Sequence, residues 1–407
     1  MKIFANVTAR AWAVLFLGGL AGMLFYIDRQ TLSVLKTTLR DEMGWTDTHY
    51  SWLVAAFMVP YTACYFVTGR LIDRHGTRVM MPVFIGAMSL ATLLSGFAQN
   101  LGQMAACRFL LGMAEAGIVP AVLVAIVAWF PKDRRGTATT INKPLTIAGQ
   151  IIATPMCVWI THHWGWRWSF FIPGVIGLLA AKLWWMADQR NLGASEPTTE
   201  NEPAPGYGEV LRNRALWGLV LARILSDPLW FFMLYWQPAY LQEKLGMSLT
   251  KVGQVGWIPT AVALGVSMSL GVLSDWLIQR GMAPATSRIR ILQGLACLSP
   301  SVLVLPWITD HALAIALLCL AQIMMSVWLG LSNLLMTDLV PRRMVGTAVA
   351  IMSAFGAGTG ALFNLVAGPL IENLGYTTIF VAGALLHPLA AVLLWWCYDR
   401  KSAASAV

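Results

Sequence analysis

Four charged residues lie within apolar stretches of the N-terminal half of the sequence. Asp28 and Arg29 are adjacent, and Arg108 and Glu115 are seven residues apart, on one face of a helix. Burying an ionisable side chain in a bilayer costs at least ~2.5–3.5 kcal/mol, so each needs a partner or a water-filled cavity. Carboxylates that arginines partly neutralise are suited to binding protons and anions. A buried ion network that only fixes helix register is the structural alternative.

The elements that must position these residues are membrane-spanning helices. The 407 residues are 57% hydrophobic and only 12% charged, which is typical of an integral membrane protein. Twelve apolar blocks are each long enough to cross a bilayer, and the sequence therefore predicts an all-α membrane protein with about twelve helices. The blocks are 12–35, 50–69, 79–98, 103–129, 137–161, 169–187, 214–241, 252–278, 289–308, 312–337, 346–371 and 376–398.

The positions of the basic residues explain the net charge of +9. With both termini in the cytoplasm, only five of the 28 Lys and Arg residues fall on the outer side, namely Lys36, Arg40, Arg167, Lys244 and Lys251, and five more lie within apolar blocks, namely Arg29, Arg108, Lys143, Lys182 and Arg223. The rest face the cytoplasm, as the positive-inside rule expects. No nucleic-acid partner is needed, and the six cysteines have no metal-like spacing. We expect no metal and no cofactor.

Repeated motifs divide the chain into two halves. Glycine, aspartate and a terminal arginine recur at the same spacing in G-R-L-I-D-R-H-G-T-R (69–78) and G-V-L-S-D-W-L-I-Q-R (271–280). Proline and Gly-Thr-Ala recur in P-K-D-R-R-G-T-A (131–138) and P-R-R-M-V-G-T-A (341–348). A polar stretch rich in Pro, Gly and Glu lies between the halves. We predict an N-terminal six-helix bundle over 1–187, a cytoplasmic linker over 188–212 and a C-terminal six-helix bundle over 213–407, the layout of an alternating-access transporter.

The motif at 69–78 closely resembles the loop signature of the major facilitator superfamily, and 271–280 resembles its weaker second copy. The resemblance implies the fold of that superfamily. It also implies a conformational latch in which a carboxylate at a cytoplasmic helix end pairs with basic groups of a neighbouring helix. The residues assigned to the latch are Gly69, Asp73, Arg74, Gly76, Arg78 and Asp275. The arginines of the first copy could also serve only to set the topology.

Two further stretches, Y-I-D-R (26–29) and R-F-L-L-G-M-A-E-A (108–116), resemble the anion:cation symporters of that superfamily. The resemblance implies that Arg29 contacts a substrate carboxylate, that Asp28 and Glu115 exchange protons, and that Arg108 pairs with Glu115. It places Tyr26 and Tyr61 beside a sugar, although both could be packing residues. The buried amides Gln150 and Asn364 are candidate substrate ligands or hydrogen bonds between helices.

The seventh block is similar to the corresponding helix of hexuronate transporters. Pro228 and Pro238 are expected to break this helix, and Asp227 either binds a substrate hydroxyl or pairs with Arg223. Lys143 departs from the hexuronate pattern: it could favour a dianion such as an aldaric acid or an aromatic dicarboxylate, or its side chain could extend to the cytoplasmic interface.

Other functional classes have less support. The sequence has no His-Glu-x-x-His, Gly-x-Ser-x-Gly or P-loop motif, so we expect no enzyme. A transport-inactive sensor of the same fold would have no need of all four buried charges. Sodium coupling would require several oxygen ligands away from cations. The resulting prediction is a monomeric, proton-coupled symporter of a small organic anion, most simply a monocarboxylate sugar acid, in the lipid of a bacterial-type inner membrane.

Overall fold

The chain is helical throughout its described part. The computed structural model describes residues 8–131, 134–188, 207–341 and 344–399, and these contain no strand. The first half consists of α1 (Ala9–Val34), α2 (Lys36–Met43), α3 (Asp47–His75), α4 (Thr77–Ser95), α5 (Leu101–Glu115), α6 (Ile118–Trp129), α7 (Arg135–Trp164) and α8 (Trp168–Ala187). The second half consists of α9 (Tyr207–Leu211), α10 (Arg214–Glu243), α11 (Leu249–Val255), α12 (Ile258–Gln279), α13 (Pro284–Ala296), α14 (Ser299–Val304), α15 (His311–Leu339), α16 (Val345–Leu374) and α17 (Tyr376–Leu394).

The predicted all-α membrane fold is confirmed. Eleven helical segments of the described residues are long and apolar enough to cross a membrane, and the bent helix α3 makes a twelfth when its two parts are counted as one span. Most spans extend a few residues beyond their apolar blocks, because a helix continues into polar residues that hydropathy does not count. The short helix α2 was not predicted, although Gly44, which ends it in a left-handed conformation, is a typical C-terminal signal.

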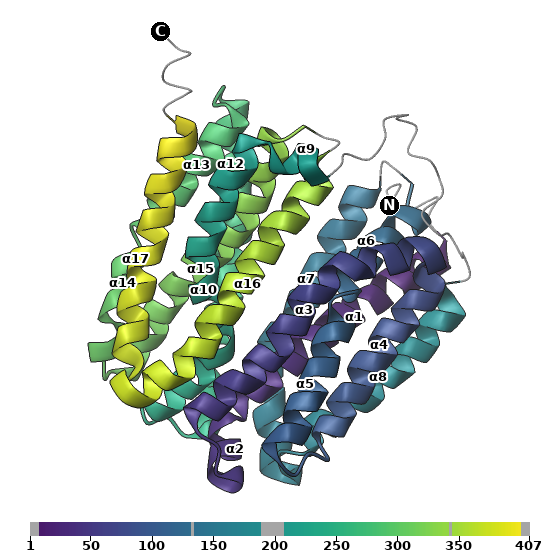
Figure 1. Cartoon of the computed structure of the whole chain (residues 1–407), viewed down its shortest axis with the longest axis vertical. Coiled ribbons are helices and arrows are strands. Elements are labelled where there is room, and N and C mark those ends of the chain that lie inside the picture. The colour runs from purple at the N-terminus through teal and green to yellow at the C-terminus, as the bar shows by residue number, and fades with distance from the viewer. Residues whose placement is uncertain (1–7, 132–133, 189–206, 342–343, 400–407) are drawn as a thin grey trace. The chain divides into compact units, whose positions relative to one another are not determined.

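The helices form two compact units (Figure 1). Unit 1 contains α1 to α8, except that Thr46–Ser51 at the start of α3 belongs to unit 2; unit 2 contains α9 to α17, except that Leu249–Gln254 belongs to unit 1. The same pairings recur in both: α1 packs on α7 as α10 packs on α16, and α4 packs on α8 as α14 packs on α17. Of the expected linker, 189–206 lies outside the described residues, as do 132–133 and 342–343 of the repeated motifs.

Glycines bring α1 and α7 into backbone contact and so position the charged end of α1. A Cβ added at Gly149 would lie 2.7 Å from the Met23 Cα and closer still to the Met23 carbonyl oxygen. Gly19 and Gly22 of α1 face Leu145 and Thr146 of α7 in the same contact. Small residues that let helix backbones approach each other are typical of membrane helix packing.

We expect Gly149→Ala to destabilise the protein by about 1–3 kcal/mol, because the added methyl group has no space and α1 must move. Thermal unfolding of the purified protein in detergent measures the effect. Gly86→Ala in α4 is the matched control, since no atom lies within 4 Å of its added Cβ and alanine is the better helix former. An unchanged unfolding temperature for Gly149→Ala would contradict the tight α1–α7 contact.

A buried carboxylate holds the end of the 69–78 motif in unit 1. Asp188, directly after α8, is fully buried and accepts hydrogen bonds from Thr77 Oγ1 at 2.7 Å and from Trp129 Nε1 at 2.9 Å. Thr77 begins α4 directly after Gly76, whose φ of +75° suits glycine. Asp188 therefore ties together the starts or ends of three helices.

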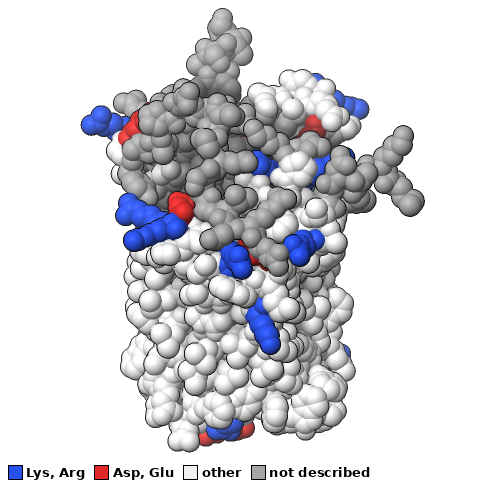
Figure 2. Space-filling model, turned by 90° about the vertical axis from the view of Figure 1, so that its right-hand side faces the viewer, with Lys and Arg blue, Asp and Glu red and all other residues white. Residues whose placement is uncertain are grey.

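The outer surface of the helices is apolar. In Figure 2 a broad band of one face lacks charged side chains, and Lys and Arg gather toward one end. Large exposed apolar side chains on α4 and α8 include Val83, Leu90, Leu179 and Leu183. Such a surface is stable in lipid rather than in water, which agrees with a multi-pass membrane protein.

Candidate functional site

The centre of the site in unit 1 is an ion pair between α1 and α5. Arg29 Nε donates to Glu115 Oε2 at 2.9 Å, and the two side chains are 3% and 0% exposed. Removing two charges from water costs several kcal/mol each, which their attraction offsets only when the geometry is good. The second carboxylate oxygen of Glu115 is buried without a hydrogen-bond partner among the described residues. The Glu115 carboxylate therefore uses only one of its two oxygens in hydrogen bonds with the described residues.

Three aromatic rings surround the Arg29 guanidinium. Its central carbon lies 3.8 Å from the ring centre of Phe25, 4.4 Å from that of Tyr61 and 4.7 Å from that of Phe57. A cation over the face of an aromatic ring is attracted by the ring quadrupole, more strongly when water is excluded. These rings hold the guanidinium in place without neutralising it, so that it remains able to bind an anion.

Asp28 adds a second buried carboxylate beside this pair. It is 3% exposed, and its Oδ1 has no hydrogen-bond partner in the part of the chain that the structure describes. Arg108 from α5 is also buried, and its Nη1 donates to the backbone oxygen of Asp28 at 3.2 Å. The predicted convergence of two acids and two arginines in unit 1 is thus present.

Glu115 forms an ion pair with a neighbouring helix. It was predicted to pair with Arg108 of its own helix, and its carboxylate pairs with Arg29 of α1. Arg108 is buried and donates to the backbone oxygen of Asp28. A pair between Arg108 and Glu115 stays a prediction.

The helix that carries Glu115 is interrupted directly after this residue. Glu115 is the last residue of α5, and α6 begins at Ile118 within the same span. Broken helices often mark binding sites in transporters. The break was predicted instead at Pro228 and Pro238, and this prediction was wrong: α10 runs without interruption from Arg214 to Glu243. Neighbouring helices can satisfy the carbonyls that a proline leaves unpaired in a membrane helix.

The other predicted residues of unit 1 lie around this centre or apart from it. Tyr61 is buried and shares a hydrogen bond of 3.0 Å with the hydroxyl of Tyr65, whereas Tyr26 is half-buried and packs edge-on against Phe25. Gln150 is buried next to Gly149, and Lys143 is exposed on α7. A substrate role for these four residues stays a prediction.

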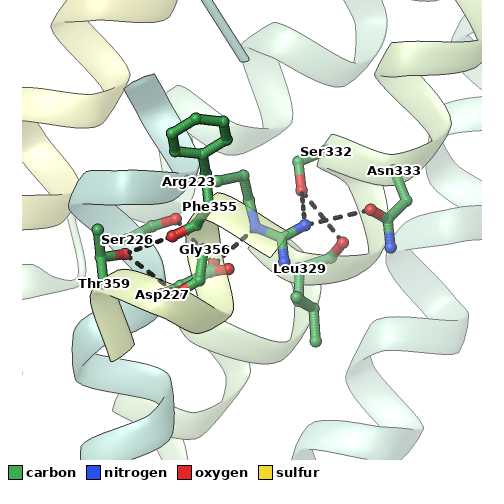
Figure 3. Close-up of polar contacts among 9 residues, drawn as sticks. All are labelled: Arg223, Ser226, Asp227, Leu329, Ser332, Asn333, Phe355, Gly356 and Thr359. Carbon is green, nitrogen blue, oxygen red and sulfur yellow. Dashed lines mark hydrogen bonds and ion pairs between the residues drawn. The ribbon is translucent and has the colours of Figure 1, made fainter. Parts of the chain in front are cut away.

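In unit 2 the structure contains the Arg223–Asp227 pair. Arg223 Nε donates to Asp227 Oδ1 at 2.6 Å, one turn along α10, and both side chains are buried (Figure 3). Asn364 accepts a hydrogen bond from Trp236 Nε1 at 3.0 Å and donates to the Gly360 oxygen at 2.9 Å. Asn364 therefore makes the interhelical bond that its alternative interpretation expects.

The predicted latch residues lie at helix ends. Asp73 and Arg74 are exposed on the last turn of α3, Gly69 lies one turn earlier, and Asp275 is exposed on α12. The Arg78 guanidinium lies 5.4 Å from the ring centre of Trp185. No ion pair of Asp73 occurs among the described residues, and the latch stays a prediction.

Comparison with known proteins identifies the family of this helical chain. The family model described as Major Facilitator Superfamily matches residues 18–363. The chain belongs to the major facilitator superfamily. The protein is therefore a multi-pass membrane transport protein and not an enzyme.

Relatives within the superfamily are similar over nearly the whole chain. The hexuronate transporter of Escherichia coli (strain K12) is 28% identical, over 96% of this chain and 95% of its own. The probable galactarate/D-glucarate transporter GarP of the same strain is 27% identical, over 92% and 90%. The D-galactonate transporter of Escherichia coli O6:H1 is 27% identical, over 91% and 92%. The predicted resemblance to the sugar-acid branch of the superfamily is confirmed.

A solved structure shares the fold. An inward-facing, occupied bacterial homologue of the human lysosomal transporter Spinster has a TM-score of 0.76 and covers 97% of this chain and 98% of its own. The sequences are only 19% identical, and the likeness concerns the fold alone.

Proposed function

We propose that this protein is a proton-coupled symporter of a monocarboxylate sugar acid, either a hexuronate or an aldonate. The observation that carries the proposal is the buried Arg29–Glu115 ion pair with a second carboxylate, Asp28, beside it. The names of the relatives support the substrate class, since they are transporters of hexuronate, galactonate and galactarate or glucarate.

Competition for Arg29 couples the two ligands. A substrate carboxylate that binds the Arg29 guanidinium takes the place of Glu115, whose Oε2 now accepts from Arg29 Nε. The negative charges of Glu115 and Asp28 are then less well neutralised. Burial of the two carboxylates and the repulsion between their charges both favour proton binding. Substrate binding thus promotes protonation, and protonation of Glu115 frees Arg29 for the substrate.

Protons suit this site better than sodium. A hard cation needs several oxygen ligands, whereas here Arg29 and Arg108 lie among the carboxylates. A sodium ion at this site would be repelled by both guanidinium groups. We therefore assign the coupling role to Asp28 and Glu115 and the anion-binding role to Arg29.

The transport cycle follows from the two units. We propose that the transporter works as a monomer by alternating access in an inner membrane, with both termini in the cytoplasm and the latch formed by Asp73, Arg74, Arg78 and Asp275 closing one state. Lys143, exposed on α7, adds a positive charge that a dicarboxylate could use. A transport-inactive sensor would bind the sugar acid without moving it.

Uptake of labelled galacturonate and glucuronate into proteoliposomes tests the proposal. We expect an inward proton gradient to raise accumulation several-fold, and an imposed sodium gradient to have no effect. Unlabelled galactarate serves as the dicarboxylate competitor. Binding without gradient-driven uptake would favour the sensor, and competition by dicarboxylates alone would move the substrate class to dianions.

A further inference from the structure

Two basic side chains lie on the surface of unit 1, where α4 packs on α8. Lys182 is exposed on α8 and is the single charged residue of that helix. Arg78, in the first turn of α4, is half-buried, and its guanidinium lies 5.4 Å from the ring centre of Trp185. Lys182 and Trp185 are three residues apart, and such residues are neighbours on a helix surface. Both cations therefore lie beside the same indole ring.

The described residues supply no anion to these cations. Neither α4 nor α8 contains an aspartate or a glutamate. Asp188, directly after α8, is fully buried, and its two oxygens accept hydrogen bonds from Thr77 and Trp129. In the part of the chain that the structure describes, Lys182 and Arg78 form no ion pair, and Arg78 Nε is buried without a hydrogen-bond acceptor.

The surroundings of the two cations favour an anion that comes from the lipid. A lysine on the lipid-facing surface of a membrane helix is unfavourable unless its ammonium reaches the interface or meets an opposite charge. Lys182 lies five residues before the end of α8, or about 7.5 Å along the helix axis, which places it close to that interface. The N-terminus of α4, next to Arg78, adds the positive end of a helix dipole.

We propose that Lys182 and Arg78 bind the phosphate of an anionic phospholipid, such as phosphatidylglycerol. Lysine and arginine both donate hydrogen bonds to phosphate, and tryptophan is typical of the headgroup level of a membrane. The exposed apolar side chains Val83 of α4 and Leu179 and Leu183 of α8 offer a surface for the acyl chains. In Figure 2 the basic side chains border an uncharged band of this kind at one end.

Charge distinguishes an anionic lipid from a zwitterionic one at this site. Phosphatidylcholine carries a quaternary ammonium group beside its phosphate, and neither α4 nor α8 has a carboxylate to accept that positive charge. The ammonium group would therefore meet Lys182 and Arg78 without a compensating anion. A soluble phosphate would satisfy the cations but would leave the apolar surface around Leu179 and Leu183 unused. Lipid binding here does not depend on which substrate is transported.

Native mass spectrometry of the full-length protein in detergent tests the site, with phosphatidylglycerol and phosphatidylcholine of identical acyl chains as the probes. The wild type should bind phosphatidylglycerol several-fold more tightly than phosphatidylcholine. Lys182→Gln should weaken phosphatidylglycerol binding about fivefold, the factor expected for one lysine at an anionic lipid surface, and leave phosphatidylcholine binding unchanged. Lys182→Arg keeps the charge and should bind as the wild type does. Lys244→Gln, at an exposed lysine after α10, changes the net charge equally and should have no effect.

Three results would overturn the proposal. In the first, the wild type binds both lipids equally well. In the second, Lys182→Gln keeps the wild-type affinity for phosphatidylglycerol, or Lys244→Gln loses as much as Lys182→Gln does, so that only net charge matters. In the third, glycerol 1-phosphate, which lacks acyl chains, displaces the lipid at equal concentration, and the site is then one for a soluble phosphate. Should Lys182→Gln not fold, Arg78→Gln removes the other cation and should give the same loss.

Discussion

Arg29→Ala is expected to weaken sugar-acid binding about 30-fold or more and to abolish uptake. Removing one partner of a buried, hydrogen-bonded charge pair costs about 2–5 kcal/mol, and 1.4 kcal/mol corresponds to a factor of ten. The three rings around the guanidinium would then surround an empty volume, since alanine reaches none of them. Titration calorimetry with galacturonate on the detergent-purified protein measures the loss.

The variant also leaves Glu115 without its ion pair, so that a folding defect must be separated from a binding defect. The double variant Arg29→Ala with Glu115→Gln removes the unpaired charge and should recover stability without recovering binding. Arg40→Ala is the control, because Arg40 pairs with Asp41 at an exposed position on α2. Wild-type affinity in a folded Arg29→Ala protein would exclude Arg29 as the anion-binding residue.

Asp28→Asn is expected to abolish proton-driven accumulation while substrate exchange continues. The asparagine keeps the size of the side chain but cannot take up and release the coupling proton. Arg29, one residue further along α1, still pairs with Glu115 and can still bind the substrate. Accumulation under an inward proton gradient should fall to its level without a gradient, whereas exchange between internal and external galacturonate should stay within a few-fold of the wild type.

The matched control is Asp41→Asn, at an exposed carboxylate on α2. It should accumulate substrate normally. Gradient-driven accumulation by Asp28→Asn at the wild-type level would remove Asp28 from the coupling path and leave Glu115 as the remaining candidate. Loss of both accumulation and exchange would instead indicate that Asp28 is needed to maintain the site.

The spans and the charged residues could be predicted because both are properties of the sequence itself. A run of about twenty apolar residues indicates a membrane helix wherever it packs, and a charge inside it is conspicuous. Contacts between side chains of different helices could not be predicted in this way. The Arg29–Glu115 pair depends on the relative rotation of α1 and α5, which no local pattern fixes.

The aromatic rings around Arg29 show the same limit. Phe25 lies one turn before Arg29 on α1, and helical spacing could have identified it. Phe57 comes from α3 and could not be found in this way. The predicted break in α10 failed for a different reason. A proline indicates a break from local chemistry alone, whereas the surrounding helices stabilise the continuous helix.

The balance of charge in unit 1 has an electrical consequence. In the proposed mechanism, Arg29 and Arg108 cancel Asp28 and Glu115 when all four side chains are ionised, so this group carries no net charge in the substrate-free transporter. A charge that crosses a potential of 100 mV gains or loses about 2.3 kcal/mol. In that mechanism, one proton with a monovalent anion would make transport electrically silent, and a second proton would make it current-carrying.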